Sequence, residues 1–398
     1  RGAGRAMARR EGGGVMANDT SKEALYQERL ARVNAAINLE PVSMIPSMYQ
    51  FTAYAPLAVG ATLAEWCEDA DVAVTSTLAA MDLVGDIDGI NQMPVGNHMM
   101  NLSGLWMSRV LTPGRELPPN SLWQVVEGEL MSTDDYDTIA TKGWDAFYQS
   151  FLPRVVNMED WKRHWDWVIP NLSLVPQQFR EHGYVVMSPA IATIPFEYLC
   201  GGRSMTKFFF DLYRMPDKVQ AAMDVMIDGL IQAGIGAAKL AGVPHMWVGG
   251  WRSASSMLAP KLWDRFVWAY LRKMCLGLHE AGITPILHWD QDWTRDLARL
   301  KELPAKSFIV NPDGMTDIRK AKEVLRDHGC IMGDVPASLF AAGAPDQINE
   351  YVRDLVRDIG PTGLILCPGC DGPVNTKPEN LQAFVAASRE YGKVGVPA

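Results

Sequence analysis

In the second half of the chain, short apolar runs alternate with longer segments in which apolar residues recur every three or four positions. Short runs of this kind are typical of buried strands, and the longer segments are typical of amphipathic helices. The predicted strands are 185–187, 245–248, 285–288, 307–310, 330–333 and 364–366, and the predicted helices are 216–241, 260–281, 292–303, 318–328, 345–359 and 378–391. Strands that alternate with helices at this spacing predict a parallel sheet.

The first half is less regular. It predicts a helix over 21–39, a strand over 44–51 and further helices over 63–83 and 144–167, with a loop-rich stretch over 86–119. We therefore predict an α/β fold, a (β/α)8 TIM barrel, forming one domain over 21–398 with an N-terminal helical and loop-rich elaboration. An open doubly wound sheet is the second choice, although no glycine-rich nucleotide fingerprint and no P-loop is present in the sequence.

Residues 1–20 are set apart by composition, because they are rich in Arg and Gly and lack the apolar segment of a secretory signal. We interpret them as a disordered leader or as sequence added for expression, with Met16 as a plausible natural start. A basic targeting tail is the alternative.

Composition limits the class of protein. The 398 residues carry a formal net charge of -9, and no basic run occurs after the leader, so we expect no nucleic-acid partner. No apolar run reaches membrane-spanning length, so we expect no membrane partner. The six cysteines form no disulfide framework, which is typical of a reduced, cytoplasmic protein. The balance indicates a soluble enzyme.

Two apolar strands end in residues that bind metals. The segment 284–292 ends in His288, Asp290 and Asp292, and the segment 364–371 ends with Cys370 in a Cys-Pro-Gly-Cys sequence. If both strands belong to one barrel, both open on the same rim, where imidazole, carboxylate and thiolate are competent zinc ligands. We therefore predict a metal site of His288, Asp290 and Cys370.

Each of these residues has a structural alternative. His288 could be a core histidine that is hydrogen-bonded to the backbone, and Asp290 could cap the helix that follows. Cys370 could be an inert loop cysteine. For Asp292 we favour a helix N-cap over a ligand. Cys367 ends its strand, and we expect its side chain to be buried. The sequence leaves open whether Asp290, Asp292 or Cys367 is a metal ligand.

Further polar and aromatic residues lie near predicted strand ends. Glu197 and Asp334 are candidate catalytic carboxylates, and Glu197 is alternatively a charge partner for Arg203. Tyr49, Trp251 and Trp289 are candidate substrate-binding residues, because aromatic rings suit a flat apolar ligand. Packing between helices and barrel is the alternative for the aromatic residues.

Several of these segments together resemble the uroporphyrinogen decarboxylase superfamily, over nearly the whole chain from about Glu28. They are Pro195-Phe196 with Gly201-Gly202, Leu258-Ala259-Pro260, Pro285-Ile286-Leu287-His288, Gly333-Asp334-Val335-Pro336, and Pro368-Gly369-Cys370 followed by Glu379-Asn380-Leu381. The resemblance implies a (β/α)8 barrel with its site in the mouth.

The superfamily has two well-known branches. Its decarboxylases hold an acidic tetrapyrrole with an Arg-containing stretch near the N-terminus, whereas residues 47–54 here contain no arginine. The corrinoid-dependent methyltransferases, similar to methylcobamide:coenzyme M methyltransferase, hold zinc with a His-x-Cys pair and a Cys in a Pro-Gly-Cys loop. This chain matches His288 and Cys370 and has Asp290 where that branch has its first Cys. Oxygen in place of sulfur hardens the ligand set.

The resemblance implies a zinc-dependent methyltransferase of a corrinoid system, which moves a methyl group between cobalamin and a small methylated compound, such as a methoxylated aromatic. The chain has no Asp-x-His-x-x-Gly cobalamin motif, so we expect the cobalamin on a partner corrinoid protein or free. A homodimer is possible. The alternatives are a metal-independent decarboxylase of a small carboxylic acid and a non-catalytic docking subunit for a corrinoid protein.

Overall fold

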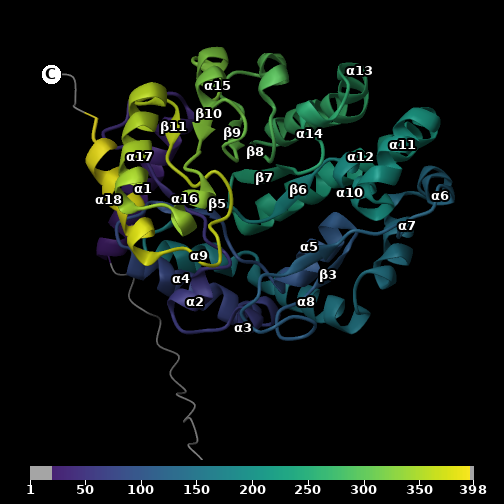
Figure 1. Ribbon diagram of the computed structural model, residues 1–398, viewed down its shortest axis with the longest axis horizontal. Coiled ribbons are helices and arrows are strands. Elements are labelled where there is room, and N and C mark those ends of the chain that lie inside the picture. The colour runs from purple at the N-terminus through teal and green to yellow at the C-terminus, as the bar shows by residue number, and fades with distance from the viewer. Residues whose placement is uncertain (1–19, 395–398) are drawn as a thin grey trace, which may run out of the picture.

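The structure is a computed structural model, and it describes residues 20–394 (Figure 1). Of the predicted leader, residues 1–20, all but Thr20 lie outside the described residues; the first helix begins at Thr20. The described chain is a mixed α/β protein with parallel sheets and many helices, which confirms the parallel α/β architecture expected from the sequence.

Nine short strands form two parallel sheets. The first sheet has the order β1-β2-β5 and the second has the order β11-β10-β9-β8-β7-β6. The strands are β1 (Met48–Tyr49), β2 (Gly89–Gln92), β5 (Val185–Ser188), β6 (Ile191–Thr193), β7 (His245–Gly250), β8 (Thr284–Trp289), β9 (Ile309–Pro312), β10 (Cys330–Met332) and β11 (Leu364–Ile365). A separate antiparallel pair consists of β3 (Arg109–Leu111) and β4 (Gln124–Val126).

The two parallel sheets adjoin at both ends. Beside β1 and β11, Met48 N–H donates to Leu366 O at 2.8 Å and Leu366 N–H donates to Pro46 O at 2.8 Å. At the other end β5 pairs with β2, while β6, which starts three residues after β5 ends, pairs with β7. The single strand expected over 185–187 is thus followed by a second strand that the apolar pattern does not predict, and β2 lies in the stretch expected to be loop-rich.

The helices cover the sheets on the outside (Figure 1). The long and medium helices are α1 (Thr20–Ile37), α4 (Ala70–Val84), α5 (His98–Trp106), α6 (Asp134–Lys142), α7 (Trp144–Phe151), α8 (Met158–Asn171), α9 (Leu174–Glu181), α10 (Pro195–Arg203), α11 (Met205–Arg214), α12 (Pro216–Ala241), α14 (Ala269–Glu280), α15 (Ile318–Leu325), α17 (Pro345–Ile359) and α18 (Pro378–Tyr391). The short ones are α2 (Ala55–Ala58), α3 (Leu63–Glu68), α13 (Pro260–Trp263), α16 (Ala337–Ala342), and the 3-10 or π turns η1 (Leu152–Arg154), η2 (Ser255–Met257), η3 (Asp264–Trp268) and η4 (Thr294–Glu302).

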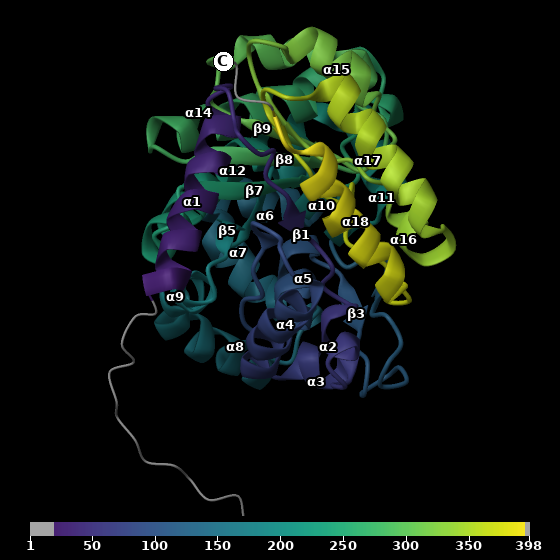
Figure 2. The ribbon, with the colours of Figure 1, turned by 90° about the vertical axis from the view of Figure 1, so that its left-hand side faces the viewer.

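Local sequence explains several helix starts. Proline occupies the first turn of α10, α12, α17 and α18, where its missing N–H costs no helical hydrogen bond. Asp317 accepts a hydrogen bond from Lys320 N–H and so caps α15. Helices α17 and α18, the last two of the fold, lie side by side (Figure 2). The helix expected over 292–303 is instead the 3-10 segment η4.

Although the sequence pattern predicted no segment of membrane-spanning length, helix α12 is the one helix of the described chain that is long and apolar enough to cross a membrane. This is weak evidence, because the core helix of a soluble protein passes the same test. Its apolar residues Met223, Met226, Ile227 and Ile231 are buried in the main core, and the helix packs on α6, α14 and β6. We therefore interpret α12 as a core helix.

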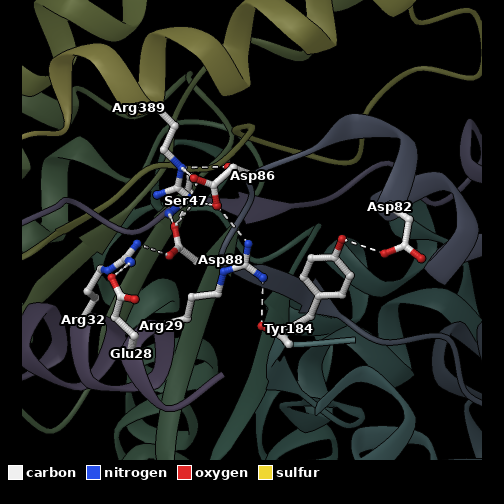
Figure 3. A network of polar contacts seen from close by, with 10 residues as sticks. Glu28, Arg29, Arg32, Ser47, Asp82, Asp86, Asp88, Tyr184 and Arg389 are labelled. Carbon is white, nitrogen blue, oxygen red and sulfur yellow. Dashed lines mark hydrogen bonds and ion pairs between the residues drawn. The ribbon is translucent and has the colours of Figure 1, made fainter. Parts of the chain in front are cut away.

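A polar network anchors α1 and α18 to the start of the sheets (Figure 3). Asp88 is fully buried just before β2 and accepts hydrogen bonds from Ser47 N–H at 2.9 Å and from Arg32 at 2.8 Å. Arg389 of α18 lies 3.0 Å from Asp88 Oδ2, the oxygen that also accepts from Ser47 N–H. Arg29 reaches Asp86 at 2.9 Å. A buried carboxylate that is shared by two guanidinium groups joins elements from both ends of the chain.

Candidate metal centre

His288, Asp290 and Cys370 converge at the carboxyl ends of two strands. His288 lies in β8, Asp290 follows β8, and Cys370 lies in the loop after β11. His288 Nε2 is 3.4 Å from Asp290 Oδ1, and Cys370 Sγ is 3.9 Å from the same oxygen. The three ligand atoms all lie within 4.8 Å of one another. The structure thus brings together all three predicted ligands.

The backbone explains why these side chains meet. Residues 288 and 290 are two apart at a strand end, so they face the same side. The loop that carries Cys370 is held by Gly369 N–H, which donates to Val335 O at 2.8 Å, and by Gly372 N–H, which donates to Gln50 O at 2.8 Å. A Cβ at position 369 would lie 2.6 Å from the Asp313 carbonyl oxygen. Glycine therefore permits the close approach of this loop to the end of β9.

The orientation of the His288 ring is set by two neighbours. Nδ1 lies 2.9 Å from Asn311 Oδ1, and Asn311 donates in turn to Met332 O at 2.8 Å. Because an amide oxygen can only accept, Nδ1 carries the proton and Nε2 is free to bind a metal. The indole of Trp247 stacks on the imidazole, with centroids 4.6 Å apart and planes 22° apart.

The electrostatics of the cluster favour a cation. Burial lowers the pKa of His288, but contact with Asp290 and Cys370 outweighs burial and raises the pKa well above its usual value. Burial raises the pKa of Asp371 to about 6, and burial together with Asp290 raises the pKa of Asp313. Several acidic groups thus surround one imidazole, which is an unfavourable arrangement unless positive charge is supplied.

The donor set fits zinc, which binds imidazole nitrogen, carboxylate oxygen and thiolate sulfur. His288 is buried, whereas Asp290 and Cys370 are partly exposed, so one face of the cluster is open to solvent. Within residues 20–394, no fourth His, Cys, Asp or Glu joins this group. Three protein ligands with an open face are typical of catalytic rather than structural zinc sites.

The other two ligand candidates lie differently. Asp292 Oδ1 accepts from Thr294 N–H at 2.8 Å at the start of η4, in agreement with the capping interpretation. Cys367 is fully buried, and its thiol lies 3.5 Å from Gln50 Oε1. Burial raises the pKa of Cys367 well above its usual value, which keeps it a neutral thiol.

Glu197 lies at the start of α10 and is fully buried. Its carboxylate accepts hydrogen bonds from three successive backbone N–H groups, those of Trp251, Arg252 and Ser253, at 2.9–3.1 Å. It therefore holds the loop that follows β7. Arg203 is not its partner, because Arg203 pairs with Asp211 at 2.8 Å and with Glu129 at 2.5 Å.

Asp334 follows β10 and is almost completely buried. The Tyr351 hydroxyl donates to Asp334 Oδ1 at 2.8 Å. Burial raises the pKa of Asp334 to about 7. A carboxyl group with such a pKa can take up and release a proton near neutral pH.

The predicted aromatic residues occupy three environments. Tyr49 is buried and lines a 60 Å³ cavity together with Gln50, Met93 and Ser188. Trp251 is partly exposed and packs on Trp106 and Trp247, at centroid distances of 5.5 and 5.8 Å. Trp289 is buried and stacks on Trp293 at 4.5 Å; it alternates with His288 along β8 and so lies on the opposite face of the sheet.

Asn91 is a site residue that the sequence pattern does not indicate. It is fully buried in β2, and its amide donates to Gln50 Oε1 at 2.6 Å and to Asn311 Oδ1 at 3.1 Å. Asn91 thus links the small cavity at Gln50 to the partner of His288. The four residues of β2 include one large apolar side chain, Ile90, so no apolar run marks this strand.

The uroporphyrinogen decarboxylase (URO-D) family profile matches residues 171–391, more than half of the chain. The chain belongs to the uroporphyrinogen decarboxylase family. The matched part of this URO-D protein contains all three candidate ligands, and it also contains Glu197, Trp251, Trp289 and Asp334. The resemblance expected from the sequence is confirmed.

The fold of this URO-D family member is similar to that of a methyltransferase from Methanosarcina mazei. The two structures superpose with a TM-score of 0.67, at 17% sequence identity, over 91% of this chain and 98% of the other. At this identity the likeness concerns the fold. No curated protein matches the sequence.

Proposed function

We propose that this protein is a zinc-dependent methyltransferase of a corrinoid system. It would move a methyl group between a small methylated compound, such as a methoxylated aromatic, and cobalamin. The observation that carries the proposal is the convergence of His288, Asp290 and Cys370 within 4.8 Å, with one face open to solvent. The fold shared with the Methanosarcina mazei methyltransferase supports it.

We also infer that the two parallel sheets form one closed (β/α)8 barrel. The hydrogen bonds that join Leu366 to Met48 and to Pro46 support closure on one side, and the succession of β5 and β6 supports it on the other. If β5 and β6 are taken as one bent strand, eight parallel strands surround the axis. The carboxyl ends of such strands carry the active site in enzymes of this fold.

His288, Asp290 and Cys370 would hold the zinc. Bound there, zinc would supply Lewis acidity toward an oxygen or sulfur of the substrate, and a carboxylate ligand in place of a thiolate would strengthen this character. Asn311 and Trp247 keep the His288 ring in place, and Glu197 fixes the loop that carries Trp251. These contacts organise the ligands before substrate binds.

Asp334 is our candidate for the residue that handles a proton or orients the substrate, because its pKa is raised to about 7. Glu197, which accepts three backbone hydrogen bonds, would act by positioning. We assign Tyr49 and Trp251 to the substrate-binding surface. Trp289 would support this surface from behind through its stack on Trp293.

Because the sequence has no Asp-x-His-x-x-Gly motif, the cobalamin would come on a partner corrinoid protein or as free cofactor. We further propose that the protein acts in the cytoplasm, as free cysteines suggest. We also propose that the protein is a homodimer.

The test is metal binding combined with methyl transfer. Purified protein should bind about one zinc per chain and transfer a methyl group from a methoxylated aromatic to Co(I) cobalamin. His288→Ala and Cys370→Ala should lose both properties, whereas the exposed His279→Ala should keep both. Full transfer activity in metal-free Cys370→Ala would overturn the mechanism.

A metal-independent decarboxylase of a small carboxylic acid is the second candidate, and the family to which the chain belongs favours it. The two candidates differ in a measurable way. A decarboxylase would release carbon dioxide after chelator treatment, without cobalamin, and with Cys370→Ala as active as the unchanged protein.

A further inference from the structure

A second cavity lies on the flank of the fold and adjoins the 60 Å³ cavity, with which it shares the lining residues Val95, Asn101, Ala190 and Ile191. It has a volume of 360 Å³ and is lined by residues of α5, α7, α8, α10, α12 and β6. None of the candidate metal ligands lines it. A cavity of this size accommodates a small organic molecule. We refer to it below as the flank cavity.

Aromatic side chains form its walls. They are Trp144, Tyr148, Trp161, Trp165 and Tyr198. The rings of Trp144 and Tyr148 are 4.8 Å apart, and Trp144 meets Tyr198 edge to face at 5.4 Å. Trp161 and Trp165 form a second edge-to-face pair at 5.8 Å. Such walls offer both ring faces and ring edges to an aromatic guest.

Two hydroxyl groups in these walls lack partners. Within residues 20–394, neither the Tyr148 nor the Tyr198 hydroxyl makes a hydrogen bond, and both side chains are partly exposed within the cavity lining. Because no protein group occupies these two hydroxyls, both are available to a ligand in the cavity. Burial raises the pKa of both tyrosines, which keeps them protonated as donors.

The charge of the lining excludes anions. Asp145 is the one charged residue among the described lining residues, and it is exposed at the edge. No Lys, Arg or His lines the cavity. A carboxylate or phosphate would therefore leave water without a positive partner, which is unfavourable.

We propose that the flank cavity binds an uncharged aromatic compound with an oxygen substituent, a phenol or an aryl ether. The ring would lie between the tryptophans, and the oxygen would accept a hydrogen bond from Tyr148 or Tyr198. This site is separate from the metal centre, so the proposal does not rest on the methyltransferase activity.

Two glycines line the cavity, and they differ in the space around them. A Cβ at Gly229 of α12 would have Trp144 Cδ1, at 4.0 Å, as its nearest neighbour, so a side chain there has room to extend. A Cβ at Gly104 of α5 would lie 2.7 Å from the Tyr148 hydroxyl and 2.8 Å from the Trp161 ring. Gly104 thus lets both rings approach α5.

The experiment is calorimetric titration of the purified full chain with 2-methoxyphenol. We expect saturable binding with a micromolar to submillimolar dissociation constant. Gly229→Leu should weaken it at least tenfold by filling the cavity, while Gly229→Ala, which also suits a helix, should bind nearly as the unchanged protein. Tyr148→Phe with Tyr198→Phe should weaken binding about threefold to tenfold through the lost hydrogen bond.

Controls separate this site from the metal centre. His288→Ala should bind 2-methoxyphenol with unchanged affinity, and benzoate should bind at least tenfold more weakly. The proposal is overturned if Gly229→Leu binds as tightly as the unchanged protein, or if His288→Ala abolishes binding. Equal or tighter binding of benzoate or of benzyltrimethylammonium would overturn the assigned ligand class. Circular dichroism of each variant verifies that it is folded.

Discussion

At the scale of single residues, the properties of His288 depend on its neighbours. The ring is buried, its Nδ1 side faces Asn311, and its Nε2 side faces Asp290 and Cys370. A neutral histidine side chain has two tautomers of similar energy, so the contact with Asn311 decides which ring nitrogen can bind a metal. We therefore expect the amide of Asn311 to influence metal affinity without contacting the metal.

We predict that Asn311→Leu weakens zinc binding by roughly 10- to 100-fold, because the imidazole loses the acceptor that orients it. Asn311→Asp retains an acceptor oxygen at the same position and should bind zinc within a few fold of the unchanged protein. Competition with a chromophoric chelator measures both affinities. Equal affinity of Asn311→Leu and the unchanged protein would contradict the orienting role.

Asp334 leads to a prediction about pH. Its pKa is about 7 in the folded state against a usual value of 3.8, so folding favours the protonated form. The stability that this group contributes is fully present below about pH 4 and is lost as the pH rises through about 7. Asp334→Asn should therefore become more stable relative to the unchanged protein between pH 4 and pH 8, by a few kcal/mol at most (about 1.4 kcal/mol for each pKa unit).

Urea unfolding at several pH values measures this difference. The Asp86→Asn variant serves as a control. Burial raises the pKa of Asp86, but contact with Arg29 and Arg389 outweighs burial and lowers the pKa below its usual 3.8, so the contribution of this group should stay nearly constant from pH 4 to pH 8. A difference between Asp334→Asn and the unchanged protein that stays constant from pH 4 to pH 8 would show that Asp334 does not titrate in this range.

At the scale of elements, the loops at strand ends do the positioning. Gly369 lets the Cys370 loop approach Asp313. Glu197 accepts hydrogen bonds from the N–H groups that follow β7. Asp371 accepts a hydrogen bond from Thr52 N–H at 2.7 Å. Each loop is thus held by a neighbour from another βα unit. On the other side of the sheets, the Asp88 network holds α1 and α18 in the same manner (Figure 3).

We predict that Asp88→Ala lowers the free energy of unfolding by about 3–5 kcal/mol, since it leaves two guanidinium groups and Ser47 N–H without their buried partner. Asp82→Ala, which removes a half-exposed carboxylate bound to His182 and Tyr184, should cost less than about 1 kcal/mol. Chemical denaturation at pH 7 compares the two. Similar losses for both variants would refute the special importance of Asp88.

At the scale of the whole molecule, the candidate centre joins distant parts of the chain. Asp290 and Cys370 are separated by 80 residues and by three βα units, yet their side chains meet. A metal bound to both would link β8 with the last strand of the fold. Since this arrangement exists in the folded state, binding should stabilise folding as a whole.

We predict that zinc at 100 times its dissociation constant stabilises the protein by about 2.7 kcal/mol and raises the melting temperature by several degrees. His288→Ala should show no such rise, and His279→Ala should respond as the unchanged protein does. Differential scanning calorimetry with and without chelator measures the shift. An identical rise in His288→Ala would place the stabilising zinc elsewhere.

The sequence predicted the elements in which apolar patterning is strong. Strands β7, β8 and β10 lie where apolar runs end abruptly, and Pro216, Pro345 and Pro378 mark helix starts. Strand β2 was not predicted, because its residues do not form an apolar run. Strand β6 was not predicted, because only its pairing with β7 distinguishes it from the end of β5. Pairing is a non-local property, and no local pattern encodes it.

The same division applies to the site. Ligand chemistry belongs to side chains, so His288, Asp290 and Cys370 could be selected from the sequence by residue type and strand-end position. Their separation, the roles of Asn91 and Asn311 and the burial of Glu197 depend on which strands lie next to each other. Contacts between residues far apart in the chain arise from packing of the entire sheet, and only the tertiary structure decided them.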